Sequence, residues 1–126
     1  MNDEIAKFFQ KSYRERLLYE LSSKKRGEFF TKIAHTAEKY IDTRLVIEKS
    51  DRPLPEELLE KYFPGECFVI AYNSAYDGNT AVFKDAISEL WGCGEPYLIY
   101  SGEYLYLETE YDFSIHASYL LKRSAQ

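Results

Sequence analysis

The chain has 126 residues, of which 45% are hydrophobic and 29% charged, and its formal net charge at pH 7 is −5. This length supports one hydrophobic core, and the composition argues against a disordered chain and against a small disulfide-stabilised domain. The start of the chain is acidic and lacks the apolar segment of a secretory signal. The longest apolar run, 67–72, is far shorter than the roughly 20 residues that cross a bilayer. We therefore expect a cytoplasmic protein without a membrane partner, with one domain over residues 1–126.

The first half of the chain has the hydrophobic spacing of helices. Apolar residues at steps of three and four predict an amphipathic helix over 4–22 and another over 27–41. A polar turn separates them, so we expect an antiparallel helical hairpin. Residues 43–48 are rich in aliphatic side chains and predict a short strand, although an extension of the second helix would explain them nearly as well. Pro55 and the two acids after it predict a short helix that ends near Tyr62.

The second half changes to the spacing of strands. The apolar run 68–72 predicts a central strand, and the apolar stripe that follows predicts a helix that starts near Asn79 or Thr80 and ends at Trp91. Alternating residues on both sides of 101–103 predict a β-hairpin, and a last short helix is predicted over 114–123. The predicted fold is an α+β domain in which the N-terminal helical hairpin packs on a small mixed or antiparallel sheet. The C-terminal half then has the order β-α-β-β-α.

The predicted hairpin has two different faces, because alternate side chains of a strand share a face. A loop of two or four residues places Leu98, Tyr100, Leu105 and Leu107 on one face, which we assign to the core. The other face carries Tyr97, Ile99, Tyr104, Tyr106, Glu108 and Glu110. Aromatic rings beside carboxylates have the composition of a binding surface. The alternative is that helices cover both faces of the sheet, in which case these tyrosines belong to the core.

Acidic residues and tyrosine are concentrated in the second part of the chain. Residues 53–126 contain nine of the twelve Tyr and twelve acids against four bases, a charge of −8, whereas residues 1–52 contain twelve bases against nine acids, or +3. An acidic surface with tyrosine suits a basic protein partner, because charge steers the encounter and Tyr supplies contact area. We therefore expect a non-enzymatic binding domain of inhibitor, antitoxin or immunity type. Its predicted contact residues are Tyr97, Tyr104, Tyr106, Glu108 and Glu110.

The main alternative is a small enzyme of unknown reaction that uses His35, His116 or Cys93. Two histidines can act as general acid and base, but no motif joins these two, and we expect their rings to be too far apart to share a substrate. Cys93 lies between two glycines and has the access that a nucleophile needs, yet helix-ending turns use glycine equally often. No metal-ligand spacing and no dinucleotide-binding loop is present, so neither a metal nor a cofactor is predicted.

Two further segments have features of a binding site. The loop 73–80 enters a helix N-terminus, which favours small anions, but it contains Asp77 and no base, and its Asn and Asp residues are ordinary capping residues. The cluster Lys24-Lys25-Arg26 could contact nucleic acid, but the neighbouring acids and the net charge argue against it. The same cluster could contact the acidic half of another copy and form a homodimer. An accessory or self-associating structural protein is therefore a third possibility.

Overall fold

A computed structural model describes residues 1–110 and 117–124, which form an α+β fold around one antiparallel sheet. The six strands of this described part have the order β1-β6-β5-β4-β2-β3. They are β1 (Val46–Ser50), β2 (Glu66–Ala71), β3 (Asn79–Val82), β4 (Tyr97–Ser101), β5 (Tyr104–Glu108) and β6 (Ser118–Lys122). The predicted α+β fold class is confirmed, and the sheet is antiparallel rather than mixed.

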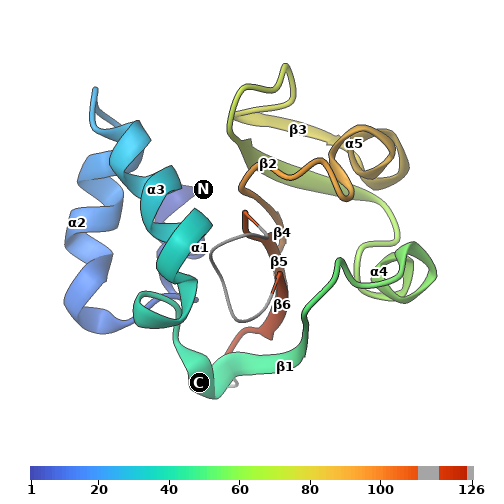
Figure 1. Ribbon diagram of the computed structural model, residues 1–126, viewed down its shortest axis with the longest axis horizontal. Coiled ribbons are helices and arrows are strands. Elements are labelled where there is room, and N and C mark those ends of the chain that lie inside the picture. The colour runs from blue at the N-terminus through green and yellow to red at the C-terminus, as the bar shows by residue number, and fades with distance from the viewer. Residues whose placement is uncertain (111–116, 125–126) are drawn as a thin grey trace.

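Helices lie on both sides of the sheet (Figure 1). One side carries α1 (Asn2–Ala6), α2 (Lys11–Leu21) and α3 (Arg26–Thr36), and the other carries α4 (Glu56–Tyr62) and α5 (Phe83–Leu90). Two short 3₁₀ turns, η1 (Ala37–Lys39) and η2 (Thr43–Leu45), lead from α3 to the edge strand β1. The helices α2 and α3 pack against each other as the predicted helical hairpin, and α4 is the short helix that was predicted after Pro55.

Each face of the sheet has its own hydrophobic core, because side chains alternate along every strand. The core beneath α1 to α3 contains the strand residues Ile70, Leu98, Tyr100, Leu105, Leu107, Tyr119 and Leu121. The core beneath α4 and α5 contains the strand residues Cys67, Val69, Ala71, Tyr97, Ile99, Tyr106 and Leu120. The four inner strands of the sheet are thus buried on both sides, whereas the edge strands β1 and β3 are largely exposed.

The helix predicted over 4–22 is interrupted between α1 and α2. Phe9 forms an isolated antiparallel bridge with Ile41. The Asp42 N–H donates to the Phe8 carbonyl at 2.9 Å, and the Gln10 N–H donates to the Tyr40 carbonyl at 2.8 Å. These backbone groups bond to a remote segment instead of continuing the helix, so the prediction of one unbroken helix is wrong.

The helix predicted to start near Asn79 starts at Phe83. Residues Asn79–Val82 form the edge strand β3, in which Asn79 lies opposite Val69 and Val82 lies opposite Glu66. The N-cap residue of α5 is Val82, so the predicted capping role of Asn79 or Thr80 is wrong. The unpaired edge of β2 bonds to these residues and outweighs their suitability as caps.

The last helix, predicted over 114–123, is replaced in the described residues by β6. This strand pairs with β5 on one side and β1 on the other, with Leu121 opposite both Leu105 and Val46. Tyr119 and Leu121 enter one core and Leu120 enters the other. A run of apolar residues that is buried on both faces fits a central strand better than a helix with one apolar side.

Candidate functional site

The β4–β5 hairpin has the predicted register. Tyr97 lies opposite Glu108, Ile99 opposite Tyr106 and Ser101 opposite Tyr104. The predicted sorting of side chains between the two faces is therefore confirmed within the two strands. It is wrong for Glu110, which was assigned to the Tyr97 face and lies beside His35 of α3 on the other side. The expected exposure of the Tyr and Glu face is wrong for Tyr97, Tyr106 and Glu108, each 0% exposed, because α4 and α5 cover that face.

The two remaining predicted contact residues, Tyr104 and Glu110, are partly exposed. Tyr104 is half-buried, and its ring meets that of Tyr62 on α4 edge to face at a centroid distance of 4.8 Å. Glu110 follows β5, and its carboxylate lies 3.4 Å from Nε2 of His35 on α3. Tyr104 and Glu110 lie on different sides of the sheet, so the five predicted residues do not form one surface.

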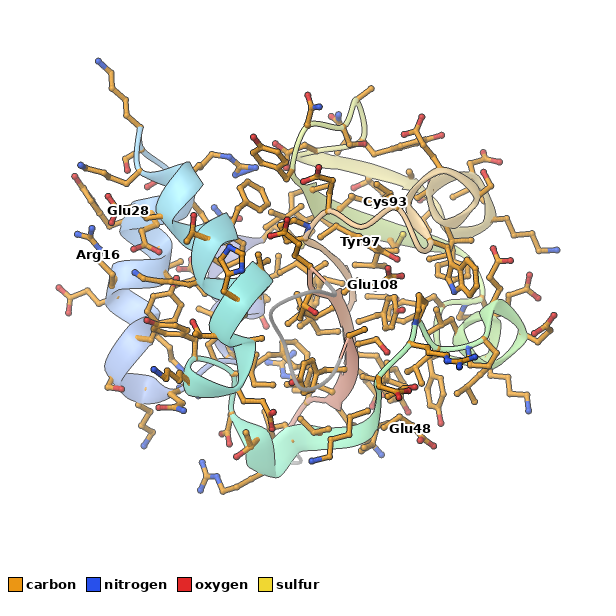
Figure 2. The ribbon with its side chains drawn as sticks, in the orientation of Figure 1. Arg16, Glu28, Glu48, Cys93, Tyr97 and Glu108 are labelled. Atoms are coloured by element: carbon orange, nitrogen blue, oxygen red, sulfur yellow. The ribbon has the colours of Figure 1, made fainter. Side chains whose placement is uncertain are left out.

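Glu108 is a buried carboxylate that organises the core beneath α5. It accepts hydrogen bonds from the Tyr97 hydroxyl, from the Tyr106 hydroxyl at 2.9 Å and from the Gly92 N–H at 3.1 Å. Figure 2 shows Tyr97, Glu108 and Cys93 beside the loop that follows α5. Burial, and then the Glu108 charge, raise the pKa of Tyr97 and of Tyr106 far above the ordinary tyrosine value, so both hydroxyls stay protonated as donors.

A second buried carboxylate, Glu20, lies in the helical layer and is 0% exposed. It accepts from the Tyr13 hydroxyl at 2.6 Å, from Arg16 Nε at 2.9 Å and from the Lys32 ammonium group. Burial raises the pKa of Glu20, but the bonds from Lys32, Tyr13 and Arg16 together outweigh burial and hold that pKa below its ordinary value. Glu20 is therefore an ionised link between α2 and α3.

The candidate catalytic residues do not form an identifiable centre among the described residues. His35 lines a cavity of about 220 Å³ with Phe30, Tyr72 and Glu95. His116 lies outside the described residues, so the predicted separation of the two histidine rings stays a prediction. Cys93 is exposed, but partial burial, and then the Glu108 and Glu95 charges, raise its pKa. A raised pKa lowers the thiolate fraction and with it the nucleophilicity of the group.

The two cysteines are expected to react very differently with a thiol reagent. Cys67 is buried, and burial raises its pKa to about 11, whereas Cys93 is exposed. An aromatic disulfide reagent should modify one thiol per native chain, at a rate that rises through the alkaline range, and Cys93→Ser should remove that reaction. Fast modification at neutral pH that does not change with pH would show a stabilised thiolate and would revive Cys93 as a nucleophile.

The loop 73–80 and the Lys24-Lys25-Arg26 cluster are joined by an ion pair. The Arg26 guanidinium donates to Asp77 at 2.6 Å, and Asp77 also accepts from the Ala71 N–H at 3.0 Å. The carboxylate considered as part of a ligand site thus holds the loop against α3. Lys24 and Lys25 remain exposed.

Exposed carboxylates are concentrated on α4, on α5 and at the first residue of β2. We define the acidic surface by Glu56, Glu57 and Glu60 of α4, Glu66 of β2, and Asp85 and Glu89 of α5, all exposed. Lys84 approaches Glu60 only to 4.0 Å. Beside these acids the Trp91 ring is 39% exposed, while its Nε1–H donates to the Leu54 carbonyl at 2.7 Å.

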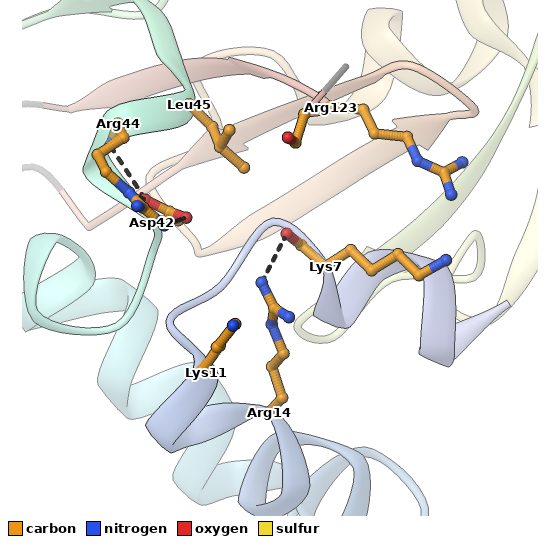
Figure 3. A pocket seen from close by; sticks show the side chains of 8 residues that line it. Lys7, Lys11, Arg14, Asp42, Arg44, Leu45 and Arg123 are labelled. Carbon is orange, nitrogen blue, oxygen red and sulfur yellow. Dashed lines mark hydrogen bonds and ion pairs between the residues drawn. The ribbon is translucent and has the colours of Figure 1, made fainter. Parts of the chain in front are cut away.

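A cleft of opposite charge lies beside the N-terminal helices (Figure 3). Its cavity of about 580 Å³ is lined by Asp42, Leu45, Ser124 and five cations, which are Lys7, Lys11, Arg14, Arg44 and Arg123. We call it the basic cleft. Sequence reasoning missed it because its cations come from separate segments that no spacing connects. The only signal was the charge of +3 over residues 1–52.

No protein-family model matches the chain, and comparisons with curated proteins and with solved structures give no match. Within residues 1–110 and 117–124, no group of three or more His, Cys, Asp or Glu side chains is placed to hold a metal ion. None of the helices in the same part of the chain combines the length and the apolar character needed to cross a membrane.

Proposed function

We propose that this protein is a non-enzymatic binding domain, of inhibitor, antitoxin or immunity type, that binds a basic protein through the acidic surface. The observation that carries the proposal is the set of six exposed carboxylates on α4, β2 and α5. These elements adjoin one another, since α5 contacts both α4 and β2. Carboxylates of one sign on adjoining elements produce a field that attracts a basic partner and orients its approach.

The acidic surface also has features that can accept individual side chains. A cavity of about 280 Å³ between α4 and α5 is lined by apolar Phe63, Pro64, Val82 and Phe83, by the Glu60 carboxylate and by the exposed Lys84. A Lys or Arg side chain of the partner can pack its aliphatic stem on that wall while its cation meets Glu60. The Trp91 ring is fixed by its bond to Leu54, so it offers contact area at little further entropy cost.

This proposal moves the expected interface from the centre of the hairpin to its rim and the helices that cover it. The half-buried Tyr104 adjoins α4 through its contact with Tyr62, and it is the member of the predicted tyrosine set that lies next to the acidic surface. Tyr97 and Tyr106 support the surface from below, because they pack in the core that holds α5.

Neutralising three acids of this surface is expected to slow association with the partner. A basic protein retained from the native lysate at low salt is purified and used as the probe. The variant Glu60→Gln/Glu66→Gln/Glu89→Gln should then associate about tenfold more slowly at low salt, with a weaker salt dependence. Stopped-flow or surface-plasmon measurements of the association rate at several salt concentrations provide the test.

The matched control removes three exposed carboxylates that lie elsewhere. Asp3→Asn/Glu15→Gln/Glu48→Gln changes the net charge by the same amount, and Figure 2 shows Glu48 on β1, at the opposite edge of the sheet from β3. Its association rate should stay within about twofold of the unchanged protein. Equal slowing of both variants would show attraction by net charge alone and would overturn the proposed surface. Retention of no basic protein would contradict the proposed function itself.

A further inference from the structure

The basic cleft has no role in the binding of a basic partner, and its charge opposes that of the molecule as a whole. Five cations and one carboxylate line the cavity, in a chain whose net charge is −5. The residues that line the cleft come from the N-terminal helical layer, from the turn before β1 and from the end of β6. The acidic surface lies on α4, α5 and the first residue of β2. We infer that the basic cleft is a binding site for the polyphosphate group of a small molecule.

Two carboxylates position the cations of the cleft. Asp42 accepts from Arg44 at Nε (3.0 Å) and at a terminal nitrogen (2.9 Å), which fixes the guanidinium plane. Glu4 lies 3.3 Å from the Lys7 ammonium and 3.1 Å from Arg123. With Glu4 included, the cleft still has an excess of three positive charges. Prior positioning of charged side chains lowers the entropy cost of binding an anion.

The position of one cation of the cleft, Lys11, is not explained by the stability of the fold. Lys11 makes no hydrogen bond or ion pair with any described residue. Arg14 donates to the backbone carbonyls of Phe9 at 3.0 Å and Lys7 at 3.3 Å, which holds it at the cleft wall. Both cations lie in the first turn of α2, which contains no acid, although acids are the residues that stabilise such a turn. A local arrangement that opposes stability is typical of a functional site.

The chemistry of the lining favours phosphate over other anions. Guanidinium groups bind phosphate oxygens in pairs, and Arg14, Arg44 and Arg123 retain N–H donors besides those already bonded to backbone carbonyls, Asp42 and Glu4. The two lysines add point charges. Leu45 is the apolar side chain of the lining, and none of the described residues contributes an aromatic ring to the cavity that could stack on a nucleobase. The volume of about 580 Å³ lies within the range of small-molecule sites. The ligand is therefore recognised by its phosphates, and a nucleotide and a free polyphosphate share that chemistry.

Isothermal titration of the full chain at low ionic strength with sodium tripolyphosphate tests the inference. Lys7→Gln/Lys11→Gln is expected to weaken tripolyphosphate binding by about tenfold, because it removes two cleft charges and leaves the arginines in place. ATP should bind with an affinity similar to that of tripolyphosphate. ATP binding without tripolyphosphate binding would instead show recognition of the base and would overturn the inference.

The control variant is Lys24→Gln/Lys25→Gln. Each double variant removes two exposed lysines and one exposed ion pair between residues three positions apart. The pair is Lys7 with Glu4 at 3.3 Å in the test variant and Lys25 with Glu28 at 3.4 Å in the control. The control should bind tripolyphosphate as the unchanged protein does. Equal weakening in both variants, or no binding to the unchanged protein, contradicts the inference. Binding of an oligoglutamate peptide in place of tripolyphosphate would assign the cleft to an acidic segment and also overturn it.

Discussion

Replacement of Glu108 by Ala is expected to lower the free energy of unfolding by about 3–5 kcal/mol, one of the largest effects of any single change in this chain. The substitution leaves the Tyr97 and Tyr106 hydroxyls and the Gly92 N–H without their shared acceptor in a buried core. It also leaves a cavity where the carboxylate was. Urea denaturation followed by tryptophan fluorescence measures the loss, since Trp91 adjoins Gly92.

Tyr106→Phe is the companion to this substitution and Glu103→Ala is the control. Tyr106→Phe removes one donor to Glu108 and should cost about 1.5–3 kcal/mol, the usual range for a bond to a charged group. Glu103 is an exposed residue of the hairpin turn, and its loss should change stability by no more than about 0.5 kcal/mol. A Glu108→Ala protein of unchanged stability that has lost partner binding would return Glu108 to the role of a contact residue.

The second large effect concerns Glu20 and depends on pH. Glu20→Gln is expected to lower the free energy of unfolding at pH 7 by about 2–4 kcal/mol, because Lys32 and Arg16 lose an ionised acceptor in a buried position. The pKa of Glu20 in the folded state lies below its ordinary value of 4.5. The folded state thus gains stability from ionised Glu20 above that value and loses it as the pH falls through the lower, folded-state pKa.

Denaturant titrations at a series of pH values check this expectation. The difference in stability between the unchanged protein and Glu20→Gln should be constant near neutrality and should shrink as the pH falls below 4.5. Glu15→Gln, which alters an exposed carboxylate of the same helix, should show little difference at any pH. A gap between the unchanged protein and Glu20→Gln that stays constant down to the acid transition would rule out an ionised Glu20 as the source of the stability.

Local patterns in the sequence predicted most of the fold. The helical hairpin before residue 50 and the register of the β4–β5 hairpin depend on neighbours in the chain and agree with the prediction, whereas the break between α1 and α2 does not. The strands β3 and β6 were missed because a short segment can form either a helix or a strand, and strand pairing decides between the two. β3 forms because it pairs with the otherwise unpaired edge of β2, and β6 forms because it fills the space between β1 and β5.

The site was harder to predict than the fold. Within the two strands, the side chains that share a face with Tyr97 were identified correctly, but exposure depends on α4 and α5, whose position over that face is a tertiary property. Glu108 was expected at the surface because unpaired carboxylates are rarely buried, and the donors that make its burial possible include a loop N–H that no pattern connects to it. The charge asymmetry was read from composition, whereas the basic cleft required the fold to bring its segments together.

The place of β6 in the sheet has a consequence for the order in which the protein can fold. β6 lies between β1 and β5, and β1 pairs with no other strand among the described residues. While the chain is being synthesised, β1 therefore remains without a neighbour until residue 122 has been added and is free to pair. The strand-to-strand contacts span most of the sequence, which makes folding slow relative to a helical bundle of the same length. Until then the core beneath α1 to α3 lacks Tyr119 and Leu121, and the apolar surface that an incomplete sheet exposes favours aggregation.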